Sequence, residues 1–142
     1  MKKLFLLFLF SVSLYSTDLI KSGDYVIDKT NNKMWQDTQE NVKLLFSQEA
    51  AQKYCEKLNL GGYSDWRLPD IEDYKQILDM SRKEELKISR KFTYALADDY
   101  WASNRTWRNF GQYGYYVFFK SGAFYYQNRT YPKYVKCIRD LK

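Results

Sequence analysis

The sequence predicts one α+β domain in which two helices pack on short antiparallel strands. Apolar residues recur at helical spacing within 46–59 and again within 70–80. After Tyr100 the pattern changes to short strand-like runs separated by turn residues. The chain has 142 residues, a length that suits a single domain. Helices that precede most of the strands are typical of an α+β fold rather than an alternating α/β fold.

Residues 1–16 are predicted to be a secretory signal peptide. A short basic start precedes an unbroken apolar run over 4–10, and small residues follow, with cleavage expected after Ser13 or Ser16. An uncleaved anchor is the alternative, but the run is much shorter than the roughly 20 residues that span a bilayer. No later stretch is apolar enough to span a membrane. The domain should therefore cover 17–142 and lie in the periplasm or outside the cell.

A hairpin and a helix should open the domain. Tyr25 to Ile27 and the segment that begins with Met34 and Trp35 read as two strands joined by a polar turn. The helix is expected over 46–59. Its N-cap would be Ser47, and two glycines after it favour its end. A buried stripe is predicted along this helix, formed by Ala51, Cys55 and Leu58.

A second helix is expected to start at Asp70 and to end at Met80. Asp70 can cap the free backbone N–H groups, and Asp73 lies three residues later, in the register of a capping box. The buried stripe of this helix would consist of Ile71, Tyr74, Ile77 and Leu78. The charged segment 81–91 has no apolar period and is predicted to be an exposed loop.

Short strands should form the rest of the domain. They are predicted over 100–103, 115–119, 123–127 and 134–139. Ser121 and Gly122 would form a tight hairpin turn between the second and the third of these strands.

The two cysteines, Cys55 and Cys137, indicate a disulfide, because an even pair in an exported protein is normally oxidised. Two separate buried thiols are the alternative. The disulfide would close a loop that spans 82 positions (137 − 55). In a chain-entropy model, closing such a loop stabilises the fold by about 4.5 kcal/mol if the bond is unstrained.

The residue inventory argues against catalysis. The chain has no histidine, so a Ser-His-Asp or Cys-His site cannot be built from it. A disulfide would remove the thiol nucleophiles, and zinc would lack ligands. The remaining carboxylate pairs, Asp65 with Asp70 and Asp98 with Asp99, are better explained as helix caps and solvated surface. Calcium binding by Asp98, Asp99 and Asn104 lacks an ordered loop spacing. We therefore expect no enzyme activity, no cofactor and no metal.

The charge and the aromatic content favour an anionic partner. The formal net charge of +6 becomes +4 once Lys2 and Lys3 leave with the signal peptide. An acidic polysaccharide, a lipopolysaccharide or an acidic envelope protein would suit this charge, whereas nucleic acid does not suit an exported chain. Ordinary solubility accounts for the charge equally well.

One stretch combines cations with flat aromatic rings near predicted strand ends. Cationic groups pair with sulfate or carboxylate, and aromatic faces stack on sugars. The predicted ligand-binding residues are Arg105, Trp107, Arg108, Arg129, Tyr131 and Lys133. They lie in a near-repeat, in which Asn-Arg-Thr-Trp over 104–107 is echoed by Asn-Arg-Thr-Tyr over 128–131. The alternative is a solvated rim with its aromatics packed against the sheet.

The segment 60–69, which reads LGGYSDWRLP, closely resembles the signature of the Lcl C-terminal domain family. Further similar landmarks follow in order, among them Tyr-Trp-Ala-Ser over 100–103 and Val-Lys-Cys-Ile-Arg over 135–139. The resemblance runs from about Tyr25 to Arg139. It implies a C-type-lectin-like fold, related to that of formylglycine-generating enzymes, in which Cys55 and Cys137 tie the first helix to the last strand.

The same resemblance suggests structural roles for the landmark residues. Three tryptophans are expected in the core, beside a turn glycine, a paired arginine and the proline before the second helix: Trp35, Trp66, Trp101, Gly62, Arg67 and Pro69. Arg67 is expected to form a buried hydrogen-bonded pair with Asp65 or Asp73.

The functional expectation from the family is adhesion through sulfated polysaccharides. This chain lacks a collagen-like repeat, the calcium–sugar motifs of true lectins and the catalytic cysteine pair of formylglycine-generating enzymes. We therefore predict a non-catalytic exported module that recognises an anionic glycan or surface polymer. The alternatives are a protein-interaction subunit of an envelope assembly and, less favoured, a carboxylate-based enzyme acting on glycans.

Overall fold

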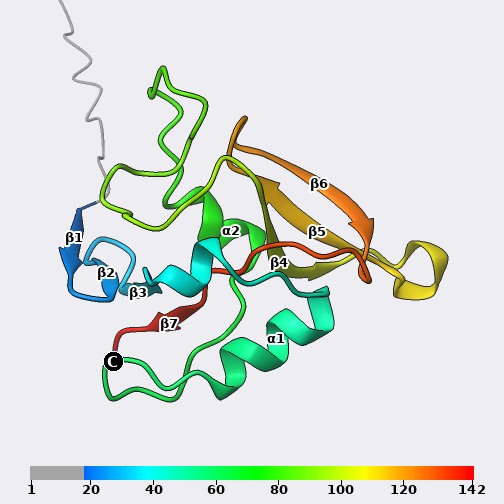
Figure 1. Ribbon diagram of the computed structural model, residues 1–142, viewed down its shortest axis with the longest axis horizontal. Coiled ribbons are helices and arrows are strands. Elements are labelled where there is room, and N and C mark those ends of the chain that lie inside the picture. Colours follow the sequence, from blue (N-terminus) through cyan, green and yellow to red (C-terminus); the bar gives the residue numbers. More distant parts are fainter. Residues whose placement is uncertain (1–17) are drawn as a thin grey trace, which may run out of the picture.

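The computed structural model describes residues 18–142, so the predicted signal peptide lies outside the described residues. Two antiparallel sheets and two helices make up the fold (Figure 1). One sheet has the order β1-β2-β3-β7, with β1 Leu19–Ser22, β2 Tyr25–Asp28, β3 Lys33–Gln36 and β7 Ile138–Asp140. The other has the order β4-β5-β6, with β4 Asp99–Arg105, β5 Tyr113–Phe118 and β6 Ala123–Asn128. The helices are α1 Gln48–Lys57 and α2 Ile71–Lys75. The predicted mixed α+β fold is confirmed.

Helix α1 forms where its cap and its apolar stripe predict it. The Ser47 hydroxyl accepts a hydrogen bond from the backbone N–H of Ala50 at 3.2 Å, which confirms the N-cap. Ala51 and Cys55 are completely buried. The helix starts two residues later than predicted, because the backbone of Phe46 pairs with that of Lys133 instead.

Helix α2 has the predicted capping box but ends at Lys75, five residues early. The Asp73 N–H donates to Asp70 Oδ1 at 2.8 Å, and the Asp70 N–H donates to Asp73 Oδ2 at 2.9 Å. The predicted continuation to Met80 is wrong because the following backbone pairs with a returning segment. Leu78 forms a β-bridge with Ile88, whose side chain is fully buried in the core. The segment 81–91 is a largely exposed loop, as predicted, except at Ile88.

The strands differ from the prediction at both ends of the domain. Strand β1 was not predicted, because Leu-Ile-Lys-Ser has no clear alternation. The predicted last strand over 134–139 is divided between the sheets: Tyr134 bridges to Tyr100 of β4, and β7 begins only at Ile138. The turn between β5 and β6 spans four residues, 119–122, rather than two.

The disulfide joins α1 to the chain just before β7. Cys55 and Cys137 lie 5.5 Å apart between Cα atoms, and both are completely buried. Trp66 and Trp101 belong to the same cluster of core residues. Trp35 lies in the second core cluster, so all three landmark tryptophans are buried as predicted.

Of the two partners predicted for Arg67, the structure selects Asp73, at 2.7 Å. Asp65 instead binds Arg139, whose guanidinium group lies over the ring of Tyr63 at 3.7 Å. The Asp73 side chain is buried as predicted, but the Arg67 side chain remains 38% exposed, so the prediction of burial is wrong for Arg67. The turn before it depends on glycine: Gly61 and Gly62 have φ angles of 64° and 80°.

Candidate functional site

The two copies of the near-repeat, 104–107 and 128–131, lie at the ends of two strands of the three-stranded sheet. Strand β5 is central and antiparallel to both neighbours, so β4 and β6 end on the same side. Gly114 at the start of β5 pairs with Arg105 on one side and with Gln127 on the other. The two Asn-Arg-Thr-aromatic segments therefore lie at one end of the sheet. Figure 1 shows the loop between β4 and β5 projecting at this end, with the ends of β6 and α1 nearby.

The loop over 106–112 presents aromatic side chains to solvent. The Trp107 side chain is 88% exposed, and that of Phe110 is fully exposed. Asn109 and Phe110 have φ angles of 47° and 57°, and Gly111 follows with 76°. Left-handed backbone costs a non-glycine residue roughly 1–2 kcal/mol, and such strain concentrates at functional sites. Phe110 was not among the predicted ligand-binding residues. Its position after two arginines and before a glycine could have indicated that it lies in a cationic loop.

The arginines of this sheet end differ from the other arginines in residues 18–142. Arg67, Arg82, Arg90 and Arg139 each form an ion pair with a carboxylate. Within the same range, no carboxylate lies within ion-pair distance of the three that remain: Arg105, Arg108 and Arg129. The pKa of Arg129 is lowered, first by its partial burial and then by the positive charge of Arg105, which together outweigh the opposite effect of Glu49. An anion placed between these two groups would relieve their repulsion.

Gln48 holds Arg129 in place from below the surface. Its Oε1 accepts a hydrogen bond from Arg129 Nε at 2.6 Å, and its Nε2 donates to the carbonyl oxygens of Ala102 and Asn104 at 2.8 and 3.0 Å. The Gln48 side chain is buried and fills the space where a side chain at position 114 would stand. Gly114 therefore allows the first turn of α1 to reach the sheet end. Sequence reasoning missed Gln48 because these partners are 54 or more residues away.

Two hollows adjoin this cluster. One, of about 370 Å³, is lined by Arg105, Thr106, Trp107, Arg108, Tyr115 and Tyr126. The other, of about 320 Å³, is lined by Glu49, Gln52, Lys53, Glu56, Arg105 and Arg129. Arg105 belongs to both. We call five cationic and aromatic residues of this region the sheet-end surface: the exposed Arg105, Trp107, Arg108 and Phe110, and the half-buried Arg129.

Two predicted residues fall outside the sheet-end surface. Tyr131 is about half exposed and follows the second segment of the repeat. Lys133 is only 4% exposed: its ammonium group pairs with Asp99 at 3.0 Å and lies over the ring of Tyr116 at 3.8 Å. Its charge is therefore neutralised within the fold, and we remove it from the candidate ligand-binding residues.

The family assignment agrees with this architecture. A family model for the Lcl C-terminal domain matches residues 24–139. The chain belongs to the Lcl C-terminal domain family. Both half-cystines and the whole sheet-end surface lie inside the matched range. Comparison with curated proteins gives no match.

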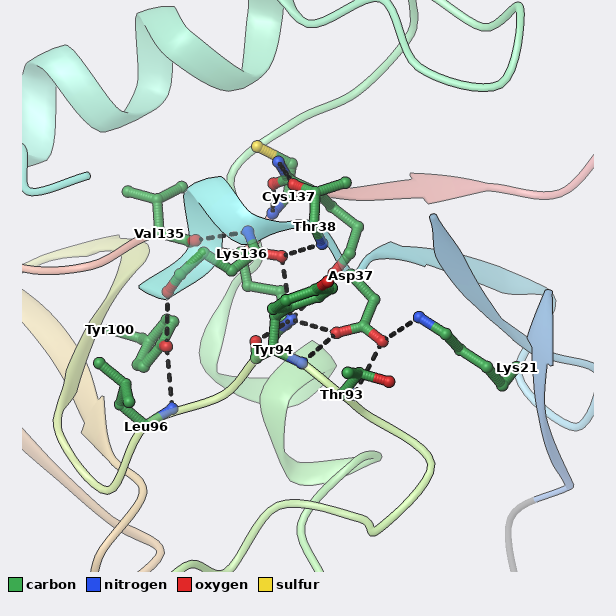
Figure 2. Close-up of polar contacts among 12 residues, drawn as sticks. Lys21, Asp37, Thr38, Thr93, Tyr94, Leu96, Tyr100, Val135, Lys136 and Cys137 are labelled. Atoms are coloured by element: carbon green, nitrogen blue, oxygen red, sulfur yellow. Dashed lines mark hydrogen bonds and ion pairs between the residues drawn. The ribbon is translucent and has the colours of Figure 1, made fainter. Parts of the chain in front are cut away.

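This Lcl C-terminal domain also contains a buried charge network that the sequence did not reveal. Asp37 and Lys136 are completely buried, with Asp37 Oδ1 3.5 Å from Lys136 Nζ (Figure 2). The ammonium group also donates to the carbonyl oxygens of Gln36 and Tyr94 at 2.9 and 3.1 Å. Burial lowers the pKa of Lys136 to about 7, although Asp37 opposes this shift.

The carboxylate of the network has further partners on two other segments. Asp37 accepts hydrogen bonds from the backbone N–H groups of Thr93 and Tyr94 at 2.9 and 2.8 Å, and Lys21 of β1 pairs with it (Figure 2). Burial alone would raise the pKa of Asp37, but Lys136 and these donors outweigh burial and lower it. All the groups are paired within the protein, so the network serves structure.

The other candidate sites of the Lcl domain are less suited to an anionic ligand. A hollow of about 600 Å³ near Tyr54 and Tyr94 carries the carboxylates of Asp24 and Glu40, and no arginine or lysine lines it, whereas the glutamates of the hollow beside Arg129 share it with three cations. In residues 18–142, no cluster of three or more Asp, Glu, His or Cys side chains is arranged to hold a metal. Neither helix in that range is long and apolar enough to cross a membrane.

Proposed function

We propose that this Lcl C-terminal domain is a non-catalytic, extracytoplasmic module that binds an anionic polysaccharide at the sheet-end surface. The observation that carries the proposal is the gathering of Arg105, Arg108 and Arg129 at one end of the β4-β5-β6 sheet, without carboxylate partners within the described range. Guanidinium groups form strong paired hydrogen bonds with sulfate and carboxylate groups. A polyanion would therefore find cations here that the fold itself has not neutralised.

The aromatic residues favour a carbohydrate as the carrier of the negative charge. Trp107 and Phe110 project into solvent on a strained loop, and Tyr126 lines the adjoining hollow. Flat rings beside arginines suit stacking on sugar faces while the charged substituents pair with guanidinium groups.

The location and the lack of catalysis rest on separate observations. A buried disulfide suits an oxidising compartment, which agrees with the signal peptide predicted for the first 16 residues. The chain has no histidine, and both cysteines are bridged. The carboxylates considered for catalysis have other partners: Asp65 binds Arg139, and Asp70 caps α2.

The test is binding of dextran sulfate, with uncharged dextran as the reference, measured by calorimetry on the disulfide-bonded protein. Replacing both Arg105 and Arg129 by Gln should weaken binding at least about tenfold, since a hydrogen bond to a charged group contributes about 1.5 kcal/mol or more. Binding should also weaken as the salt concentration rises, because exposed charges are screened.

The matched control removes two positive charges elsewhere. Arg90→Gln with Lys120→Gln gives the same net charge as the double variant, and both residues are exposed on other parts of the domain. Equal losses in the two double variants would show that net charge alone drives binding. If the folded protein does not bind dextran sulfate, the exposed Trp107 and Phe110 favour an envelope protein as the partner instead.

A further inference from the structure

We infer that the hollow beside Thr106 holds one sugar ring of the bound polysaccharide, and that the Thr106 hydroxyl recognises this ring by a hydrogen bond. The inference rests on the proposed function and deepens it. It distinguishes a surface that holds any polyanion from one that recognises a sugar.

The first observation is an unpaired hydroxyl. Thr106 is 7% exposed, and its Oγ1 is buried without a hydrogen-bond partner in the described residues. Its counterpart in the near-repeat is satisfied, since the Thr130 hydroxyl donates to Asn128 Oδ1 at 2.8 Å. Buried hydroxyl groups nearly always have a partner. Thr106 lines the hollow, so its unpaired hydroxyl points to a partner from outside, which reaches the oxygen after a small side-chain movement because the oxygen has almost no accessible surface.

The second observation is the composition of that hollow. Tyr115 and Tyr126 line it with their rings edge to face, 5.8 Å apart between centroids, and Trp107 lies beside them. Arg105 and Arg108 complete the wall. The hollow thus combines apolar faces, a hydroxyl and cations, which match the ring, the hydroxyl groups and the charged substituent of an acidic or sulfated sugar.

The volume of the hollow and the fixed backbone position of Thr106 limit the ligands that the hollow can bind. Its volume of about 370 Å³ is near the lower end for small-molecule sites, so it suits one ring rather than a length of polymer. The backbone N–H of Thr106 donates to the carbonyl oxygen of Tyr113 at 3.0 Å, which ties the residue to the sheet end. The hydroxyl therefore has a defined position against which a ring can be recognised.

The decisive comparison uses two polyanions that share sulfate groups but differ in their sugar rings. Dextran sulfate has rings, and polyvinyl sulfate has none. Thr106→Val keeps the branched shape and removes the hydroxyl. We expect it to weaken dextran sulfate binding about two- to tenfold, the usual effect of one lost hydrogen bond, and to leave polyvinyl sulfate binding unchanged. Thermal stability should be unchanged or slightly higher, because no internal hydrogen bond is lost.

Thr130→Val is the control, since this exposed threonine occupies the equivalent place in the repeat and should not affect discrimination between the two polymers. An independent readout is the NMR signal of the wild-type Thr106 methyl group, which should shift with dextran sulfate and not with polyvinyl sulfate. Unchanged dextran sulfate binding by Thr106→Val, or equal losses for both polymers, would overturn the inference and leave the proposed function standing. Failure of the wild-type protein to bind dextran sulfate would reject the proposed function itself.

Discussion

Replacing Asp37 by Asn is expected to lower the free energy of unfolding by about 3–5 kcal/mol, because buried Lys136, whose pKa is already lowered to about 7, must then either stay charged without its counter-charge or give up its proton. Lys136 is completely buried, and Asp37 is its only ion-pair partner in residues 18–142. The carboxylate also accepts the N–H groups of Thr93 and Tyr94, so its loss loosens the segment that leads into β4. Urea unfolding followed by tryptophan fluorescence would measure the change.

Two further variants distinguish the stability contributed by the buried Asp37–Lys136 pair from that contributed by a partly exposed charge. Lys21→Met removes the outer cation, which is about one-third exposed, and should cost no more than about 1 kcal/mol. Adding Lys136→Met to Asp37→Asn should recover part of the loss, since the unpaired charge is then gone. A loss below about 1 kcal/mol for Asp37→Asn alone would contradict the assignment of this pair to stability.

Removing the disulfide with the double variant Cys55→Ala and Cys137→Ala should lower the free energy of unfolding by about 2–5 kcal/mol. The bridge closes a loop of 82 residues, which includes α2 and the whole β4-β5-β6 sheet. Without it the unfolded chain gains conformational freedom, and the core cluster around Trp66 and Trp101 loses its covalent tie. Thermal and urea unfolding of the two proteins would give the difference.

Reduction provides the control for this second prediction. Dithiothreitol should destabilise the wild-type protein by a similar amount and leave the double alanine variant unchanged. A wild-type protein with the same stability before and after complete reduction would show that the bridge does not stabilise the fold. The double alanine variant should still bind polyanions under conditions in which it is folded. Gln48, which holds Arg129, is at the N-terminal end of α1, whereas Cys55 is near the C-terminal end.

Local signals in the sequence were sufficient for the features that depend on neighbouring residues. The Ser47 cap, the Asp70–Asp73 capping box and the burial of Ala51 and Cys55 on α1 were predicted and are confirmed, whereas Leu58 follows the helix and is only partly buried. These follow from interactions three or four residues apart, which a pattern records directly. The disulfide and the burial of the landmark tryptophans were predicted from residue type and family resemblance, and both are confirmed.

Features that depend on distant pairing were missed or misplaced. Helix α2 ends early because Leu78 meets Ile88, and the last predicted strand is shared between two sheets. Nothing in the local pattern distinguishes these outcomes, since backbone pairing partners are chosen by the packing of the whole domain.

Residue types in the sequence indicate which side chains can bind an anion, but contacts between distant parts of the fold determine which of them remain available. Arg105 and Arg129 are 24 positions apart, and they meet because the antiparallel sheet brings the ends of β4 and β6 to one side. Lys133 was predicted to bind the ligand, yet Asp99 neutralises it inside the fold, and Asp37 does the same for Lys136. The physical reason is that a charge is available to a ligand only where the fold supplies no counter-charge, and counter-charges are assigned by contacts between residues far apart in the chain.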